Sequence, residues 1–281
     1  MSDLFYPVFG AKMQKRHDLL TSASLFNLHD VEERRFSHKC LVELFYDLQK
    51  FIRPKTFIEF GAFDAGFSRK IREMHPLSKV IAFEANPYNY QHFTREVDFR
   101  SQNIEYHHLA VSDRDNTTMS FQIQRKRSGI EAPPVKGDDS LLKRNVSDPH
   151  EVYRDIEYET VSVDTVTLDG FFAPTIFGLD DFSAWIDVEG ALRPALSGAS
   201  RTLAATRSIL VEVEEKPFWS GQWTAGDVED YLAKIGFEPI ARDFEFEHQY
   251  NMVFVKAEVK GHYGFNQALV NYYEKIGNKR K

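Results

Sequence analysis

Short apolar segments alternate with amphipathic segments from residue 56 to residue 255, and this alternation constrains the fold of the chain most. Phe67, Ile71 and Met74 recur at helical spacing before Pro76, which indicates a helix between two such segments. The segments with the character of strands are 56–60, 79–84, 104–110, 183–188, 208–213, 237–241 and 252–255. This order predicts an α/β protein, in which helices cover both faces of a parallel sheet.

The composition excludes several classes of protein. With 42% hydrophobic and 27% charged residues, the chain has the composition of a globular protein and not of a disordered one. Its net charge of -7 argues against a nucleic-acid partner, which needs a basic face. The single cysteine, Cys40, favours a reducing compartment. No apolar run reaches the ~18 residues of a membrane span, and the first residues lack a signal-peptide pattern, so we expect a cytoplasmic protein.

The chain is expected to divide into three parts. Residues 1–54 form a helical extension, in which Ser37 caps a helix that ends before Pro54. Residues 55–258 form the α/β domain. Residues 259–281 form a C-terminal helix and a short basic tail.

One stretch of the domain lacks any periodicity. Residues 125–155 are polar and contain several Pro and Gly residues. They lie between two segments with strand character, 119–122 and 160–163. We therefore predict a long loop insertion at 125–155, and long loops in compact domains are often functional.

The segment FIEFGAFDAGFS, residues 57–68, has the features of a ligand-binding turn. A strand with Glu59 near its end is followed by Gly61, where the backbone can pass close to a ligand. A helix begins near Gly66. Ligands of open α/β sheets bind at the carboxyl ends of the strands, and Glu59 and Asp64 place carboxylates beside this turn.

The second strand ends in Glu84, and Asn86 with Pro87 predicts a helix start directly after it. A carboxylate about 20 residues beyond a glycine turn accepts hydrogen bonds from ribose hydroxyls. The turn lacks the glycine patterns of dinucleotide sites and phosphate loops, and its acidic residues would repel a phosphate. S-adenosylmethionine, which has a ribose and an ammonium group but no phosphate, fits these features.

Two further pairs of acids follow adjacent predicted strands. Asp187 and Glu189 lie in WIDVEG, and Glu212 and Glu214 lie in ILVEVEE, so the members of each pair share a face of their strand. Such acids orient an ammonium group, accept a proton from a hydroxyl or bind a divalent cation such as Mg²⁺. The candidate catalytic residues are Asp187, Glu189, Glu214 and His248, which lies between the last two strands. If a divalent ion is used, its candidate ligands are Asp187, Glu189 and Glu214.

Five segments between residues 56 and 256 carry a family resemblance. They are EFGAFDAGFS from Glu59, IAFEANP from Ile81, LAVSD from Leu109, VSVDTVTLDGFF from Val161 and IDVEGALRPALSGA from Ile186. In this order and spacing they resemble the FkbM family of S-adenosylmethionine-dependent methyltransferases. The resemblance implies the Rossmann-like fold of class I methyltransferases, with a seven-stranded, mostly parallel sheet whose last strand is antiparallel.

The resemblance implies O-methylation of a small molecule, a sugar or another polyhydroxylated compound, which could be linked to a nucleotide or another carrier. Together with the turn it predicts the cofactor-binding residues, which are Glu59, Gly61, Ala62, Phe63, Asp64, Ser68, Glu84, Ala85, Ala110, Val111 and Asp187. The chain departs from the family where Ala65 replaces the usual second glycine, which stands at Gly66 and suggests a turn shifted by one residue. Leu192 stands where the family often has Glu, and Ala85 where it often has Pro.

Other functions fit parts of the pattern. The same fold supports N-methylation or carboxyl methylation, and it also supports a non-catalytic binding protein. A nicotinamide oxidoreductase would lack its glycine fingerprint here.

Side chains outside the turn bear on the acceptor and on partners. Phe218, Trp219 and Trp223 form an aromatic group that could stack on sugar rings or pack within its own loop. The basic residues of 125–127 and 143–144 could bind an anionic carrier or simply face solvent in a loop. The N-terminal helices could cover the pocket or form the face of a homodimer.

Overall fold

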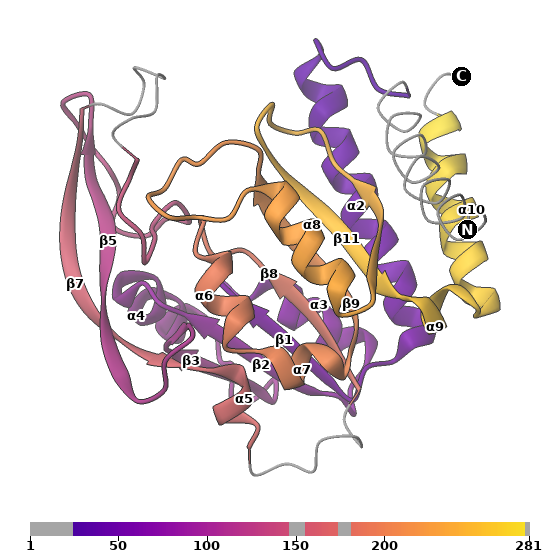
Figure 1. Ribbon diagram of the computed structural model, residues 1–281, viewed down its shortest axis with the longest axis horizontal. Coiled ribbons are helices and arrows are strands. Elements are labelled where there is room, and N and C mark those ends of the chain that lie inside the picture. Colours follow the sequence, from indigo (N-terminus) through magenta and orange to yellow (C-terminus); the bar gives the residue numbers. More distant parts are fainter. Residues whose placement is uncertain (1–24, 146–154, 174–180, 279–281) are drawn as a thin grey trace, which may run out of the picture.

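A computed structural model describes residues 25–145, 155–173 and 181–278, and its centre is a seven-stranded sheet (Figure 1). The strand order is β10-β11-β9-β8-β1-β2-β3. The strands are β1 (Thr56–Phe60), β2 (Lys79–Glu84), β3 (Ile104–His108), β8 (Phe182–Ile186), β9 (Thr206–Glu214), β10 (Phe237–Arg242) and β11 (Gln249–Lys256). β11 alone runs opposite to the other six strands, which confirms the predicted sheet.

Helices cover both faces of this sheet, as the alternation of segments predicts. On one face lie α2 (Val31–Ile52), α3 (Gly66–Met74) and α10 (Tyr263–Asn278), which follows the short α9 (Ala257–Lys260). On the other face lie α5 (Leu168–Phe171), α6 (Leu192–Ser197), α7 (Ser200–Ala204) and α8 (Ala225–Lys234). Neighbouring strand residues face opposite layers, as Trp185 and Ile186 do. None of the described helices is long and apolar enough to cross a membrane.

The N-terminal helix starts earlier than predicted. Asp30 caps α2, because its side chain accepts hydrogen bonds from the amides of Glu32 and Glu33. Ser37, the predicted cap, is buried inside the helix, and its hydroxyl accepts the amide of Phe244 at 2.8 Å. This bond ties α2 to the connection between β10 and β11. The earlier part of the predicted extension, residues 1–24, lies outside the described residues.

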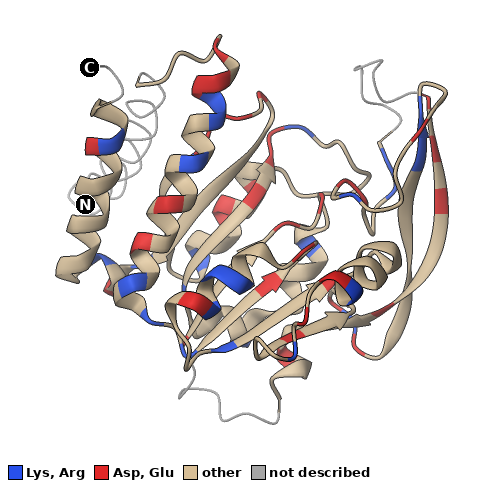
Figure 2. Cartoon of the chain, turned by 180° about the vertical axis from the view of Figure 1, so that it is seen from behind, with Lys and Arg blue, Asp and Glu red and all other residues tan. Residues whose placement is uncertain are grey.

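The predicted loop at 125–155 is in part a second sheet. Its strands are β4 (Ala110–Val111), β5 (Thr117–Arg127), β6 (Ile130–Glu131) and β7 (Ile156–Val166), in the order β4-β7-β5-β6. Figure 2 shows basic residues of β5 beside acidic residues of β7. Arg125 pairs with Glu159 at 3.6 Å and Lys126 with Glu157 at 3.5 Å, so charges that suggested a loop stabilise a hairpin.

The residues after β6 run back along β5 towards the chain beyond β9. Within 132–145, Ser140 bridges to Gln122 of β5, and Arg144 bridges to Trp219 beyond β9. The rest of the predicted loop, residues 146–154, lies outside the described residues. We call 132–145 the returning segment.

The turn after β1 is not shifted by one residue. Ala65 has φ 53°, in the left-handed region that favours glycine, and α3 begins at Gly66. Ala65 is also fully buried. The left-handed conformation therefore stays at the position where the family usually has glycine, and this chain adopts it with alanine.

Candidate active site

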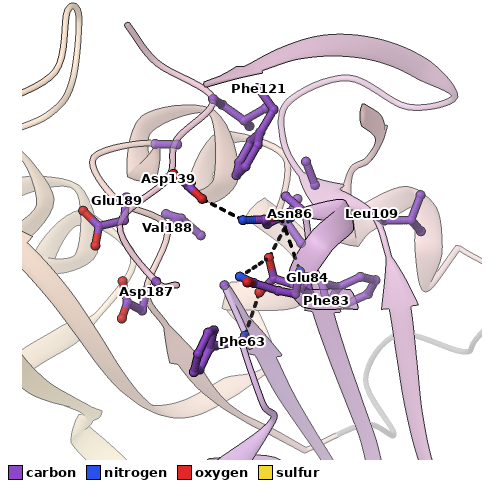
Figure 3. A pocket seen from close by; sticks show the side chains of 18 of the residues that line it. Phe63, Phe83, Glu84, Asn86, Leu109, Phe121, Asp139, Asp187, Val188 and Glu189 are labelled. Atoms are coloured by element: carbon purple, nitrogen blue, oxygen red, sulfur yellow. Dashed lines mark hydrogen bonds between the residues drawn. The ribbon is translucent and has the colours of Figure 1, made fainter. Parts of the chain in front are cut away.

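A pocket opens at the carboxyl ends of β1, β2 and β8, where the predicted turn lies (Figure 3). The turn contributes Gly61 and Phe63, and the returning segment contributes Lys136 and Asp139. The predicted cofactor residues that line it are Gly61, Phe63, Glu84, Ala85, Ala110, Val111 and Asp187. Glu189, predicted as catalytic, also lines it.

Glu84 faces this pocket in a fixed orientation. Its Oε2 accepts the amide of Phe63 at 2.7 Å, and its Oε1 accepts the amide of Asn86 at 2.6 Å (Figure 3). Burial raises the pKa of Glu84 to about 7, although these bonds favour the ionised form. The remaining lone pairs of the two oxygens suit the two hydroxyls of a ribose.

The turn and the end of β8 touch through their backbones. Gly61 has φ 74°, and a Cβ on it would lie 1.4 Å from the carbonyl oxygen of Asp187. The amide of Gly61 donates to Phe83 at 3.1 Å, and the amide of Asp187 donates to Phe60 at 3.0 Å. Only glycine fits here, so the turn and Asp187 are held in one fixed arrangement.

Four of the predicted cofactor residues do not line the pocket: Glu59, Ala62, Asp64 and Ser68. Glu59 is buried behind the turn, where its Oε2 accepts the amide of Ser68 at 2.7 Å in the first turn of α3. Burial raises its pKa to about 8. Asp64 accepts the amide of Gly66 at 3.0 Å and pairs with Arg69 at 2.6 Å. These two carboxylates make contacts within the turn and α3.

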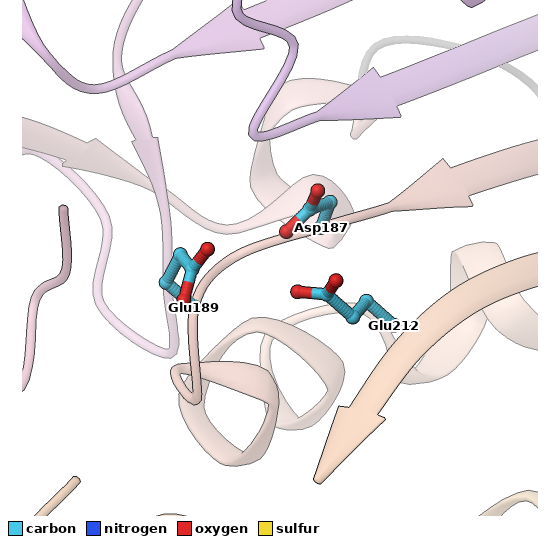
Figure 4. Close-up of side chains that lie close together, drawn as sticks. All are labelled: Asp187, Glu189 and Glu212. Atoms are coloured by element: carbon cyan, nitrogen blue, oxygen red, sulfur yellow. The ribbon is translucent and has the colours of Figure 1, made fainter. Parts of the chain in front are cut away.

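Asp187, Glu189 and Glu212 form an acid cluster at the carboxyl ends of β8 and β9 (Figure 4). One carboxylate oxygen of each lies within 4.8 Å of the others. The register of the sheet explains why Asp187 and Glu212 are close. Ile186 pairs with Val211, so the next residues, Asp187 and Glu212, lie opposite each other. This set of three could hold a divalent cation.

Burial changes the acidity of the acid cluster. It raises the pKa of Asp187 to about 6 and raises the pKa values of Glu189 and Glu212 well above the usual range. The mutual repulsion of the carboxylates adds to the shift of both glutamates. The three carboxyl groups therefore titrate as a unit and not residue by residue, at higher pH than exposed acids do.

Glu214 and His248, the other predicted catalytic residues, do not join the acid cluster or line the pocket. Glu214 is 1% exposed, and burial raises its pKa to about 8. His248 approaches Lys216, whose Nζ lies 2.7 Å from its Nε2, and Glu215, which lies 3.6 Å from its Nδ1. Glu212, and not Glu214, completes the acid cluster with Asp187 and Glu189. The alternation along β9 marked both glutamates.

His38, which the sequence analysis did not single out, forms a pair with the buried Asp243. Its Nδ1 lies 2.8 Å from Oδ2 of the fully buried Asp243. Asp243 also accepts the amide and the side chain of Asn251, which lies opposite Glu212 in the sheet. Burial lowers the pKa of His38, but the hydrogen bond and charge of Asp243 outweigh it and raise the value. No local pattern in α2 marks this residue, because its partner lies more than 200 positions away.

Two residues of the aromatic group beyond β9 pack within the protein, which was one of the two expected roles of this group. Trp219 is 1% exposed, and a Cβ on Gly190 would lie 2.3 Å from its Cδ1. Trp223 packs against Tyr231 of α8, with ring centroids 5.1 Å apart. Trp219 therefore supports the chain next to Glu189 instead of offering a face to a sugar.

The returning segment is fastened to α4 (Pro87–Glu96) at the pocket. Asn86, the predicted cap of α4, donates through Nδ2 to Asp139 at 2.6 Å. Asn89 donates to the carbonyl of Lys136 at 2.8 Å and accepts its amide at 3.0 Å. Asp139 also accepts the amide of Gln124 at 2.8 Å. We call these four hydrogen bonds, which hold the returning segment to α4 and β5, the latch.

Comparison with known proteins identifies the family. A family model described as the methyltransferase FkbM domain matches residues 58–239. The chain belongs to the FkbM methyltransferase family. The fold of this FkbM methyltransferase is that of class I methyltransferases, and its reaction is S-adenosylmethionine-dependent methyl transfer.

Individual relatives of this FkbM methyltransferase are distant. The 2-O-methyltransferase NoeI of Sinorhizobium fredii (strain NBRC 101917 / NGR234) is 24% identical over 187 residues, which are 66% of this chain and 73% of NoeI. The bifunctional kinase-methyltransferase WbdD is 12% identical, with a TM-score of 0.43 over 78% of this chain and 38% of its own. The N-terminal domain of EvdMO1, solved with SAH and D-fucose, is 10% identical, with a TM-score of 0.41 over 77% of this chain and 82% of its own.

The pocket of this FkbM methyltransferase fits S-adenosylmethionine. Oδ1 of Asp187 is buried at the pocket and has no hydrogen-bond partner among the described residues, so it can accept an ammonium group. Glu84 offers its oxygens to a ribose. S-adenosylmethionine has no phosphate that the acidic turn would repel.

Proposed function

We propose that this chain methylates a hydroxyl group of a sugar or another polyhydroxylated small molecule. The observation that carries the proposal is the acid cluster, two of whose members, Asp187 and Glu189, line the cofactor pocket. A hydroxyl needs a base as it attacks a methyl group, and the cluster supplies carboxylates at that place. The name of NoeI, a 2-O-methyltransferase, agrees with a hydroxyl acceptor.

The residues of the pocket orient the cofactor in this proposal. Glu84 accepts hydrogen bonds from the ribose, and Oδ1 of Asp187 accepts the ammonium group. Ala110 and Val111 form an apolar wall for the adenine ring. When bound, S-adenosylmethionine supplies an electrophilic methyl group on its sulfonium. The contribution of these residues is to fix that group beside the acceptor oxygen.

The acid cluster takes the proton of the acceptor hydroxyl. Asp187 has a pKa of about 6, and it shares the cluster's protons with Glu189 and Glu212. The raised pKa values make these carboxylates stronger bases than exposed ones. Glu212 does not line the cofactor pocket, so it offers a way to test the base without removing a cofactor contact.

The first test is calorimetric titration with S-adenosylhomocysteine. We expect micromolar binding that Glu84→Gln weakens at least tenfold, about 1.4 kcal/mol. Glu105→Gln on β3 is the matched control, because Glu105 is half exposed and lies outside the pocket. Absence of binding by the unmodified protein would contradict the proposal.

The second test is methyl transfer to a panel of sugars, nucleotide sugars, amines and carboxylic acids. We expect transfer to a hydroxyl, and we expect Glu212→Gln to lower kcat at least 100-fold while S-adenosylhomocysteine binding stays unchanged. Transfer to an amine or a carboxylate would favour N-methylation or carboxyl methylation. Cofactor binding without transfer to any acceptor would favour a non-catalytic binding protein.

A second candidate mechanism uses a divalent cation such as Mg²⁺. It is favoured by the three carboxylate oxygens that lie within 4.8 Å of one another. In that case Asp187, Glu189 and Glu212 would bind the ion, and the ion would lower the pKa of the acceptor hydroxyl. Assays after EDTA treatment separate the mechanisms, because only this one requires added Mg²⁺ for turnover.

A further inference from the structure

A second cavity lies next to the cofactor pocket and shares Glu189 with it. The hairpin of β5 and β7, the returning segment, the chain beyond β9 and the start of β11 all contribute to its wall. Six of its residues carry the argument: Gln124, Arg127, Arg144, Tyr158, Phe218 and Gln249.

Two residues connect this cavity to the acid cluster. Glu189 lines both cavities and is a member of the cluster. Nε2 of Gln249 donates to Oε2 of Glu212, another member, at 2.8 Å. A molecule in the second cavity can therefore reach the proposed base, and it can do so without entering the cofactor pocket.

The wall of the second cavity suits hydroxyl groups. The amides of Gln124 and Gln249 and the hydroxyl of Tyr158 can each donate and accept hydrogen bonds. Their number and variety match the alternating donors and acceptors of a saccharide ring. Gln124 is also held in place, because its backbone amide donates to Asp139 of the latch.

The wall also carries a positive charge in a fixed position. The guanidinium of Arg144 lies 5.3 Å from the ring centroid of Phe218 and 4.7 Å from that of Trp219. The two rings restrict where this planar group lies. A guanidinium held in this way binds an oxyanion through two parallel hydrogen bonds.

The cations of the wall are Arg127 and Arg144, and its acids are Asp138 and Glu189. Asp138 lies 3.2 Å from Nζ of Lys136, which is outside the cavity.

We propose that the second cavity binds the acceptor, and that the acceptor is a saccharide with an anionic group that Arg144 binds. This inference rests on the proposed methyl transfer to a hydroxyl. The anionic group is an oxyanion, and it can belong to a uronic acid, a sugar phosphate or a nucleoside-diphosphate sugar. The ring then lies among Gln124, Tyr158 and Gln249, with one hydroxyl directed at the acid cluster.

The test measures binding of four probes to the full chain saturated with S-adenosylhomocysteine: glucuronate, glucose 6-phosphate, UDP-glucose and uncharged methyl glucoside. We expect one of the charged probes to bind at least tenfold more tightly than methyl glucoside. Arg144→Gln should remove that preference and leave the affinity for S-adenosylhomocysteine unchanged. The probe that shows the preference identifies the source of the oxyanion.

Lys143→Gln is the matched control, because it removes a cation from the neighbouring exposed position, which does not line the cavity. We expect it to leave the binding of all four probes unchanged. Equal affinities of charged and uncharged probes would overturn the inference, and so would equal effects of the two substitutions. Failure of the proposed function is distinguishable, because it would appear as missing methyl transfer to every hydroxyl of the acceptor panel, whereas the binding of these four probes is measured without turnover.

Discussion

The carbonyl oxygen of Asp187 occupies the space that a side chain at Gly61 would need. A Cβ there would lie 1.4 Å from this oxygen, far inside any contact distance. The glycine of the cofactor turn is thus required by the strand next to it, in addition to any ligand. Because the two residues are in contact, a displacement of one moves the other. Both of them line the cofactor pocket.

Gly61→Ala should therefore abolish S-adenosylhomocysteine binding and lower the thermal midpoint of unfolding. Gly221→Ala is the control, because Gly221 has φ 80° and no atom lies within 4 Å of its added Cβ. The control variant should be destabilised only by the left-handed conformation of its alanine, by about 1–2 kcal/mol. Equal unfolding midpoints for the two variants would show that the contact with Asp187 is not tight.

The pKa of Glu84, about 7, predicts that cofactor binding depends on pH. The ionised carboxylate accepts the ribose hydroxyls, so the affinity for S-adenosylhomocysteine should rise from pH 6 to pH 8 and level off above that. Glu84→Gln should bind more weakly and lose most of this slope. Calorimetry at four pH values measures it, and a slope that survives in Glu84→Gln would assign the titration to another group, such as Asp187.

Buried Glu59 predicts how stability changes with pH. Its pKa is about 8 in the folded chain and near 4.5 in the unfolded chain, so the folded state binds the extra proton. Its contribution is fully present below pH 4.5 and is lost as the pH rises through 8. Between pH 6 and pH 9, the Glu59→Gln variant should therefore lose less stability than the unmodified chain, because Gln does not titrate. Gln can still accept the amide of Ser68.

Urea unfolding at both pH values provides this comparison. Glu105→Gln, at a half-exposed position of β3, should follow the unmodified chain. If the Glu59→Gln variant lost as much stability as the unmodified chain, Glu59 would not be the group that titrates.

The latch between the returning segment and α4 predicts the rate of cofactor release. Asn89→Ala removes both hydrogen bonds to Lys136, each worth about 1 kcal/mol, and a longer one of 3.4 Å to Oε1 of Glu84. S-adenosylhomocysteine should then dissociate at least fivefold faster in stopped-flow experiments, and trypsin should cleave faster after Lys136. Gln91→Ala, at an exposed position of the same helix, should change neither rate. Unchanged release in Asn89→Ala would mean that the latch does not limit the exit of the ligand.

The core of the fold was predictable because its signals are local. Buried parallel strands are short apolar runs, and Glu84, Asn86 and Pro87 mark the end of a strand and the start of a helix within four residues. The position of Asp187 followed in the same way from the apolar residues before it. Gly61 and Glu84 consequently lie in the pocket as predicted.

The errors come from contacts between distant parts of the chain. Ser37 was mistaken for a cap because its partner, Phe244, is 207 positions away. Charged residues 125–127 suggested a loop because their partners on β7 could not be identified from sequence. The choice between Glu212 and Glu214 depends on register, which pairs Ile186 with Val211 and so brings Glu212 to Asp187.

The returning segment serves both cavities within nine residues. Lys136 and Asp139 close the cofactor side, whereas Arg144 faces the second cavity. A chimera joined after Asp139 would thus exchange only the acceptor wall, and the donor side would keep its latch. A chimera joined before Lys136 would have to bring its own partners for Asn86 and Asn89. The choice of crossover point would decide whether libraries of such enzymes retain their cofactor.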